Sequence, residues 1–554
     1  MGVFAMAMLT VAAVLSLRNL PNMADYGWTI IFYLTMACIC FFIPSALVSA
    51  ELASTYPQNG GVYLWVRQAF GPKWGFVAIF MEWVENLPWF PACLTFVASA
   101  IAYVFNPDLA TNKWFVFWTI QISVWLATFL NFRGMRLSSF LSNSGVLAGT
   151  VIPGIAIILM VAIYLFMGKP VQIPYHGVSS LIPDLSNPTQ WMLLAGMMVA
   201  LSGMEMSSVH VRDMANPSTS FPKAIFLASL VVVVLSILGS LAIAVVVPPS
   251  KLSLAAGVCQ AFEDIFTSLN VKWLTPIMCF LLAYGALTMV VTWVLGPSKG
   301  LLEVARQGYL PKFWQFRNSY GMPTHILIIQ AIFTSLLTFN VLFVPTISNA
   351  FWIMSALTAQ LYMVMYLLMF AAAIRLRYTQ PNIHRPYKVP GGKLGMWIVS
   401  GIAFLTSLVS IGCGFIPPSN VLADGTVTTV GYIAFLVVGT LFFVCLPLFL
   451  YHIYEKKVAR GVIPASADDI EWKEQLKNRL AGKPVQTTVS GGTTSTAPVE
   501  KPLSVSDAEA LIKDGNAEIQ EGKEKVSEGV SELSKIQSRI DGDLKGASSQ
   551  NLKK

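Results

Sequence analysis

Length, composition and charge together exclude a soluble protein. The chain has 554 residues, of which 55% are hydrophobic and only 12% charged, whereas a soluble domain is about one quarter charged. Apolar stretches recur up to about residue 454, and many are about 20 residues long, enough to cross roughly 30 Å of hydrocarbon. We therefore predict a multi-pass membrane protein that lies in a lipid bilayer.

The apolar stretches predict an all-α transporter-sized domain of residues 1–454 with twelve transmembrane spans. In chain order the spans are 2–22, 27–50, 75–105, 113–131, 146–167, 190–210, 223–248, 274–296, 324–345, 349–374, 396–416 and 428–454. The first begins at Met1 without the basic region or the cleavage site of a signal peptide, so it is expected to stay as a span. A start codon further upstream is the alternative explanation for this abrupt beginning.

Lysine and arginine residues in the loops predict the orientation, because cytoplasmic loops are enriched in both. One set of alternate loops carries 15 of them: Arg67, Lys73, Arg133, Arg136, Arg212, Lys223, Lys299, Arg306, Lys312, Arg317, Arg375, Arg377, Arg385, Lys388 and Lys393. The opposite set carries 5: Arg18, Lys113, Lys169, Lys251 and Lys272. The richer side is predicted to be cytoplasmic, with both termini inside. The net charge of +8 follows from this topology, and no nucleic-acid partner is predicted.

The sequence lacks the patterns of catalytic, cofactor and metal sites. Nearly all of its seven cysteines lie in apolar spans, and Cys38-x-Cys40 has neither zinc-ligand spacing nor nearby histidines. The stretch "GPSKG" (296–300) lacks both the spacing of a phosphate-binding loop and a preceding strand. We therefore predict no enzyme activity, no cofactor and no metal.

The residues after 454 differ in composition from the spans. Residues 455–507 are predicted to be a cytoplasmic linker of low complexity, rich in Thr, Ser, Gly and Pro from residue 480. Residues 508–554 form a charged tail, in which apolar residues between 519 and 540 recur at near-helical spacing. This tail is expected to be disordered, or to form a weak amphipathic helix through which the protein could form homo-oligomers.

Two spans contain residues that interrupt a helix. The first reads "VAAVLSLRNLPNMADYGW" (11–28), where Ser16, Arg18 and a proline break the apolar pattern. The sixth reads "LAGMMVALSGMEMSSVHV" (194–211), where Ser202 and Gly203 precede Glu205. Spans one and six are corresponding positions in two five-helix halves, and interrupted helices at such positions indicate the binding site of an inverted-repeat transporter. Ordinary helix packing at Gly203 is the alternative.

Several stretches resemble the amino acid–polyamine–organocation superfamily, and in particular its bacterial glutamate/GABA antiporter branch. They are "SGMEMSSVHVRDMANPSTSFPKA" (202–224), "FIPSALVSAELAS" (42–54), "GGVYLWVRQAFGPKWGF" (60–76), "WVLGPSKGL" (293–301), "LTAQLYMVMYLLMF" (357–370) and "RPYKVPGGKLG" (385–395). The resemblance covers residues 1–454 and implies a LeuT-type fold, a 5+5 inverted repeat plus two helices. It also implies exchange of small amino acids or their decarboxylation products by alternating access in a bacterial inner membrane.

The resemblance also implies which residues face the substrate. They are Ser202, Gly203, Glu205, Trp293, Tyr362 and Tyr366, with polar contacts near Glu85 and Asn86. Together with Ser16 and Arg18 of the first break, these are the predicted substrate-binding residues. The chain departs from the antiporter pattern at Met289, where the antiporters have an acid, and in "LSLRNLP", which lacks the first-helix glycines of the superfamily.

Three carboxyl groups within the spans, those of Glu205, Glu85 and Glu82, are candidates for proton coupling. An acid at the bilayer centre costs about 2.5–3.5 kcal/mol on insertion scales, so it usually faces a cavity and has a function. Glu82 and Glu85 share a helix face, and their titrations are expected to be coupled. A buried structural acid is the alternative for each. His210 is a candidate pH switch or an interfacial histidine.

Three functions remain open from the sequence. The first is an antiporter of amino acids such as glutamate and GABA, with protons as a further possible partner. The second is a proton-coupled amino acid uptake permease with the same fold, and the third is a non-transporting membrane sensor or scaffold that uses the tail as its output. Related antiporters close their cytoplasmic mouth with a C-terminal segment, although this tail shows no match to that segment.

Overall fold

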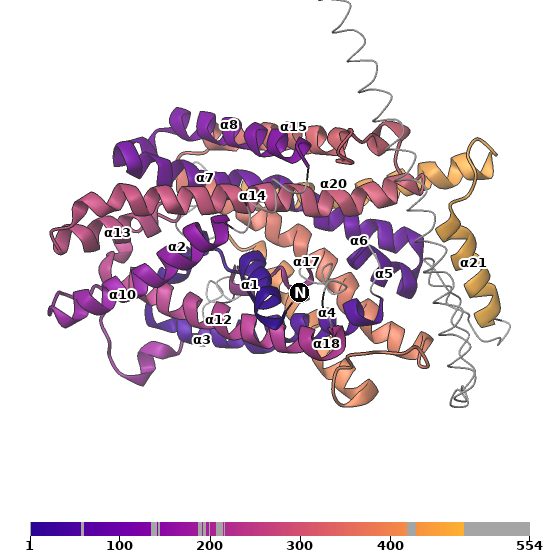
Figure 1. Cartoon of the computed structure of the whole chain (residues 1–554), viewed down its shortest axis with the longest axis horizontal. Coiled ribbons are helices and arrows are strands. Elements are labelled where there is room, and N and C mark those ends of the chain that lie inside the picture. Colours follow the sequence, from indigo (N-terminus) through magenta and orange to yellow (C-terminus); the bar gives the residue numbers. More distant parts are fainter. Residues whose placement is uncertain are drawn as a thin grey trace, which may run out of the picture. The chain divides into compact units, whose positions relative to one another are not determined.

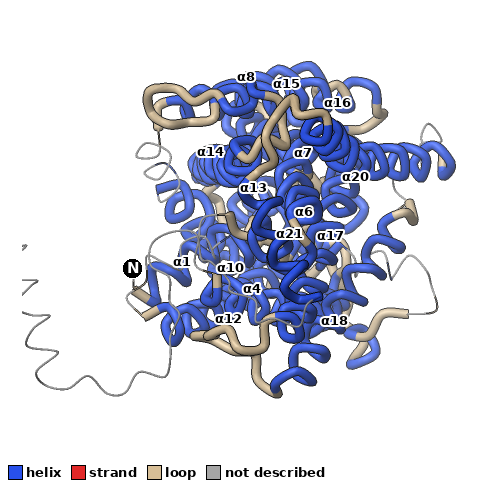
Figure 2. The backbone as a smooth tube through the Cα atoms, turned by 90° about the vertical axis from the view of Figure 1, so that its right-hand side faces the viewer, coloured by secondary structure: helices blue, strands red, loops and turns tan. Residues whose placement is uncertain are grey.

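A computed structural model describes residues 2–56, 60–134, 141, 144–184, 186, 191, 196–198, 200–206, 214, 216–417 and 428–480 (Figure 1). Within these residues the secondary structure is helical and contains no strand (Figure 2). The first half contains α1 Val3–Val14, α2 Leu20–Ala24, α3 Ile30–Ala37, α4 Ile43–Thr55, α5 Val62–Phe70, α6 Pro72–Val84, α7 Asn86–Phe105, α8 Lys113–Phe132 and α10 Ile152–Phe166. The second contains α12 Pro217–Val246, α13 Gly257–Ser268, α14 Thr275–Arg306, α15 Thr324–Thr338, α16 Asn340–Phe343, α17 Ile347–Thr379, α18 Gly392–Gly414, α20 Thr429–Ala459 and α21 Ala467–Leu480.

Ten helical stretches of the described residues are long and apolar enough to cross a membrane. They are Gly27–Thr55, Pro72–Phe105, Lys113–Phe132, Ser144–Phe166, Thr219–Val246, Lys272–Arg306, Thr324–Phe343, Ile347–Thr379, Gly392–Gly414 and Thr429–Ala459. Each matches one predicted span, and several extend beyond it by a turn or more. The interrupted span predicted at 2–22 has no such stretch, and much of the span predicted at 190–210 lies outside the described residues. The all-α multi-pass class is therefore confirmed.

The first predicted span is broken in the middle. Helix α1 ends at Val14, Leu15 and Ser16 have extended backbone angles, and a 3₁₀ turn at Leu17–Asn19 leads into α2. Pro21 is the second residue of α2, where a proline is tolerated because the first backbone N–H groups of a helix have no intrahelical acceptor. The break therefore leaves the backbone around Ser16 outside a helical hydrogen-bond ladder.

The sixth predicted span breaks at the predicted residues. Leu201 still bonds back to Met197, whereas Ser202 and Gly203 are non-helical and a 3₁₀ turn follows at 204–206. Gly203 has φ +112°, a backbone conformation that residues with a Cβ atom rarely adopt. The glycine is therefore needed at the break itself. His210 lies outside the described residues.

Helices α7, α14 and α17 form the centre of the bundle. Helix α14 packs along α7, and α17 packs against α7, α6, α5 and α18. Helices α8 and α15 lie side by side above them in both views (Figures 1 and 2). The broken first span packs against α12 through both α1 and α2. This arrangement places the break of span one opposite the side chains of α7 and α17.

Helix α21 lies inside the range 455–507 that the sequence analysis assigned to a linker. Its first turn is anchored by Asp469, whose carboxylate accepts hydrogen bonds from Tyr451 and Tyr454, both at 2.6 Å. Asp468 forms an ion pair with Arg67. Nothing in the apolar pattern of this short, charged segment predicted a helix. Residues 508–544, for which a weak helix was predicted, lie outside the described residues.

Candidate functional site

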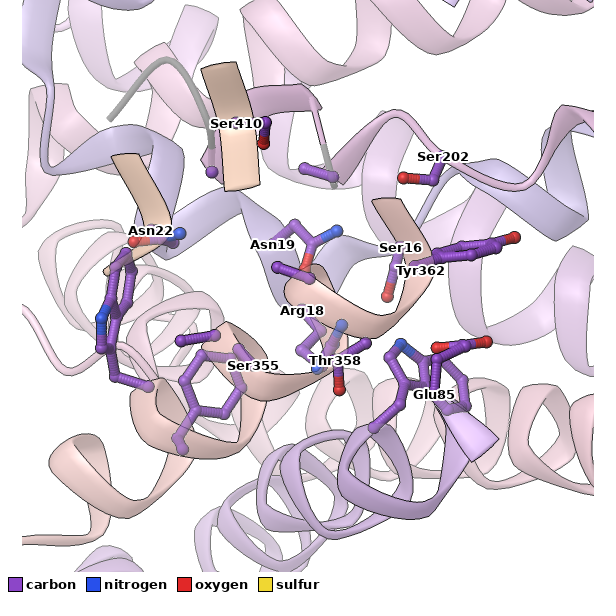
Figure 3. Close-up of a pocket in the computed structure, with 18 of the residues that line it drawn as sticks. Ser16, Arg18, Asn19, Asn22, Glu85, Ser202, Ser355, Thr358, Tyr362 and Ser410 are labelled. Atoms are coloured by element: carbon purple, nitrogen blue, oxygen red, sulfur yellow. The ribbon is translucent and has the colours of Figure 1, made fainter. Parts of the chain in front are cut away.

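A cavity of about 120 Å³ opens between the break of span one and that of span six (Figure 3). The first break, the second break, α7, α14 and α17 all contribute to its wall. Its polar lining residues are Ser16, Arg18, Asn19, Asn22, Glu85, Ser202, Ser355, Thr358, Tyr362 and Ser410. Aromatic rings complete the wall: Trp89, Trp293, Phe351, Trp352 and Tyr432. Such a mixture of apolar surface with a few polar groups is typical of small-molecule sites.

The cavity brings together six of the ten predicted substrate-binding residues. These six are Ser16, Arg18, Glu85, Ser202, Trp293 and Tyr362. The other four, Asn86, Gly203, Glu205 and Tyr366, do not line it, and neither does Glu82. Met289, the residue that replaces an acid of the antiporter pattern, is part of the wall.

Arg18 is the cation of the cavity wall. Only 7% of its surface is exposed, and its Nε and Nη1 atoms have no hydrogen-bond partner within the described chain. The guanidinium lies over the rings of Trp89 and Phe351, at 5.4 and 5.5 Å from their centroids. The backbone break accounts for this position, because the 3₁₀ turn at Leu17–Asn19 carries the side chain into the cavity rather than along a helix surface.

Glu85 is the carboxyl group of the cavity wall. It lies at the junction of α6 and α7, and its Oε1 atom is buried without a hydrogen-bond partner among the described residues. Glu82 and Glu205 are close enough to interact with it electrostatically. The amide of Asn86 donates to the backbone oxygen of Glu82 at 2.8 Å, so Asn86 serves the helix junction and does not face the cavity.

Glu205 lies behind the cavity wall and is held there by two tyrosines of α17. The hydroxyl groups of Tyr362 and Tyr366 donate to its two carboxylate oxygens, the second at 2.5 Å. Tyr366 also accepts a hydrogen bond from the backbone N–H of Gly203 at 2.8 Å. Because the ring of Tyr362 lines the cavity, this side chain connects the cavity with Glu205.

The residues that sequence reasoning missed are mostly aromatic rings and hydroxyl groups. Trp89 is one of them, and its ring centroid lies 5.5 Å from that of the predicted Trp293, so that the two rings form one side of the wall. Ser355 and Thr358 come from the same helix as the predicted tyrosines, one turn or two earlier. Among the described residues, no group of three His, Cys, Asp or Glu side chains could hold a metal ion.

Comparison with known proteins agrees with this architecture. The family model for amino acid permeases matches residues 1–443. An uncharacterized transporter of Legionella pneumophila is 40% identical over 447 residues, 81% of this chain and 95% of that protein. A glutamate/gamma-aminobutyrate antiporter of Lactococcus lactis is 31% identical over 461 residues, 82% of this chain and 91% of that protein. A probable agmatine/putrescine antiporter of the same species is 24% identical over 432 residues, 76% and 89% of the two chains. The chain therefore belongs to the amino acid permease family of the amino acid–polyamine–organocation superfamily, a family of membrane transporters.

Proposed function

We propose that the protein exchanges small amino acids or their decarboxylation products, such as glutamate and GABA, by alternating access. One observation carries this proposal: two interrupted helices open onto a single cavity that contains one guanidinium and one carboxyl group. Interrupted helices in a transporter expose backbone N–H and C=O groups that can bind the polar ends of a substrate. The identity with a glutamate/GABA antiporter supports the choice of substrate.

The same site supports a link between transport and protons. Glu205, Glu85 and Glu82 are all buried and lie close enough to interact electrostatically. Neighbouring carboxyl groups in a low dielectric do not all hold a negative charge, and their proton occupancy changes when a charged ligand or water enters. We propose that this group of acids takes up or releases a proton when the cavity closes to one side of the membrane and opens to the other. The proton is then carried by the group and not by one residue.

The location proposed for the protein is the inner membrane of a bacterium, with both termini in the cytoplasm. The excess of Lys and Arg in one set of loops supports this orientation. A fluorescent protein fused after residue 480 should fold and fluoresce in the cytoplasm of a bacterial expression host. Alkaline phosphatase fused there would be inactive, and an active fusion would reverse the orientation.

Trans-stimulation tests the exchange. Purified protein in liposomes loaded with unlabelled glutamate or GABA should take up labelled glutamate several-fold faster than in empty liposomes. Liposomes without protein, and liposomes loaded with a sugar of equal osmolarity, provide the controls. Uptake that internal substrate does not accelerate would contradict exchange.

A proton-coupled uptake permease is the second candidate, and the group of three acids is the observation that favours it. In that case an inward proton gradient should drive accumulation in empty liposomes, and a proton ionophore should abolish it. An exchanger shows the opposite pattern, because its uptake of labelled substrate depends on internal substrate and survives the ionophore.

A further inference from the structure

The charged residues of the cavity wall indicate which class of substrate the protein binds. This inference rests on the proposed function. Among the described lining residues, Arg18 is the one cation and Glu85 the one acid. Both are buried within the bundle, and each has side-chain atoms without a hydrogen-bond partner. Buried charged groups in proteins are normally paired. Two such groups facing one cavity therefore indicate that a ligand completes their bonding.

Arg18 and Glu85 do not satisfy each other. No ion pair joins Arg18 to Glu85, Glu82 or Glu205 in the part of the chain that the structure describes. Glu205 has its carboxylate oxygens bonded by tyrosines, and the guanidinium instead lies over two aromatic rings. The rings stabilise the cation, but Nε and Nη1 still lack an acceptor among the described residues. The guanidinium is thus held next to the rings with donors that no acceptor of the described chain uses.

A guanidinium held in this way matches one chemical group best. Its planar set of N–H donors fits the two oxygens of a carboxylate, and such pairs are stronger than hydrogen bonds between neutral groups. A carboxyl group on the same cavity wall can in turn accept the N–H groups of an ammonium. The wall therefore offers one oppositely charged partner to each charged group of a zwitterion. It does not fit a diamine, one of whose cations would face the guanidinium.

We propose that Arg18 is the specificity-determining residue and binds the distal carboxylate of the substrate, while Glu85 receives its amine. An acidic amino acid and its decarboxylation product share these two groups, since decarboxylation removes only the α-carboxylate. One fixed pair of charges can therefore bind both exchange partners. The α-carboxylate of the acidic amino acid is left to the freed backbone groups of the two broken helices. The rings of Trp89 and Phe351 hold the guanidinium in place after one substrate has left and before the next one binds.

A series of ligands with nearly equal shape tests the proposal on the unmodified protein. 4-Aminobutyrate, 4-aminobutyramide and 1,4-diaminobutane carry the same amine and chain, and end in a carboxylate, a neutral amide and a second amine. Binding is measured as the rise in melting temperature of the purified full-length protein, because a ligand of the folded state raises it. We expect 4-aminobutyrate and glutamate to bind at least about tenfold more tightly than the amide and the diamine. Equal binding of carboxylate and amide would overturn the proposal.

Substitutions of Arg18 provide a second test of the proposal, measured with the same ligands. Arg18→Gln should weaken binding of 4-aminobutyrate and glutamate at least about tenfold and leave binding of 4-aminobutyramide nearly unchanged. Arg18→Lys should recover part of the loss, because it keeps the charge but not the paired donors. Arg375→Gln is the matched control, since Arg375 also lies over a ring, that of Phe70, but outside the cavity. Carboxylate binding by Arg18→Gln within twofold of the wild type would overturn the assignment.

The two proposals fail in different ways. If the wild-type protein binds no amino acid or amine and shows no exchange, the proposed function itself is contradicted. If it exchanges amino acids while Arg18→Gln keeps the same preference for carboxylate over amide, only the role of Arg18 is contradicted. Tighter binding of 1,4-diaminobutane than of 4-aminobutyrate by the wild type would likewise contradict this role and leave exchange intact.

Discussion

The backbone N–H of Gly203 donates to the hydroxyl of Tyr366 at 2.8 Å, and this bond joins the break of span six to α17. The same hydroxyl donates to Glu205 at 2.5 Å. We expect Tyr366→Phe to destabilise the fold by roughly 1–3 kcal/mol, because a buried N–H and a buried carboxylate oxygen both lose this partner. The melting temperature of the detergent-solubilised protein measures the loss, and transport in liposomes should fall with it.

Tyr320→Phe is the matched control for this substitution. Tyr320 is 64% exposed and lies in the segment that precedes α15. Removing its hydroxyl should leave both the melting temperature and transport unchanged. If Tyr366→Phe behaves like Tyr320→Phe, the bond to Gly203 does not hold the break.

The positions of the breaks could be predicted from the sequence, whereas the wall of the cavity could not. Gly203 and Pro21 have local backbone requirements, which a sequence shows directly. Trp89 and Phe351 belong to the 12% of residues that are aromatic, and nothing local distinguishes a ring in the wall from one in the core or facing lipid. Their place depends on how α7 and α17 are rotated against the first span, which is a property of the packed bundle.

The positions of the buried acids could likewise be predicted from the sequence only in part. A carboxyl group within a span predicts burial and a function, and Glu85 does line the cavity. Glu205 was expected to face the cavity as well, but lies behind Tyr362. The residue type and its position after the break gave no information on this, because the tyrosines that hold it come from a helix more than 150 residues away in the sequence.

A buried ion cluster joins α4 to the end of α17 and provides a prediction on stability. Glu51 accepts two bonds from Arg377, at 2.7 and 2.5 Å, and one from the backbone of Val389 at 2.7 Å, and it pairs with Arg385. Glu51→Gln leaves two guanidinium groups without their counter-charge. We expect a loss of about 3–5 kcal/mol, seen as a lower melting temperature and lower yield of folded protein.

An exposed pair on the same bundle is the control for the ion cluster. Glu303 and Arg306 are 3.7 Å apart and about half exposed. Glu303→Gln should cost about 0–1 kcal/mol, because water screens an exposed pair. Equal effects of the two substitutions would mean that the buried cluster does not stabilise the fold.

Two helical segments cross with their backbones in close contact at Gly149, in the segment before α10, and Gly285 in α14. A Cβ atom on Gly149 would lie 2.2 Å from the Cα atom of Gly285, so the two helices must separate to accept it. We expect Gly149→Ala to cost about 1–3 kcal/mol, the usual effect of overpacking. Gly412→Ala in α18 is the control, because a Cβ there meets nothing within 4 Å. Equal melting temperatures for the two variants would contradict this close packing.

Two truncations separate the roles of α21 and the residues that follow it. Ending the chain at residue 460 removes Asp469 from Tyr451 and Tyr454, and Asp468 from Arg67, so the melting temperature should fall. Ending it at residue 480 keeps these contacts and should leave the melting temperature unchanged. If residues 508–544 close the cytoplasmic mouth, both truncations raise transport at neutral pH with little effect at acid pH. Equal transport by the full chain and both truncations at both pH values would contradict gating by the C-terminal residues.

The carboxyl group of Glu205 provides the sharpest test of proton coupling. Glu205→Gln keeps the size of the side chain and removes its titration, so folding and membrane insertion should survive, because a neutral amide is easier to bury than a charge. The pH dependence of exchange between about pH 5 and pH 8 should change, since the group of acids loses one proton site. Glu205→Leu should lower the stability of the fold, because Tyr362 and Tyr366 lose their acceptor at a cost of roughly 1–3 kcal/mol each.

Glu85→Gln, made in parallel, shows whether the acid of the cavity wall titrates instead. If Glu205→Gln exchanges at wild-type rates over the whole pH range, Glu205 is a structural acid, and the proton site lies with the other two acids, first of all Glu85.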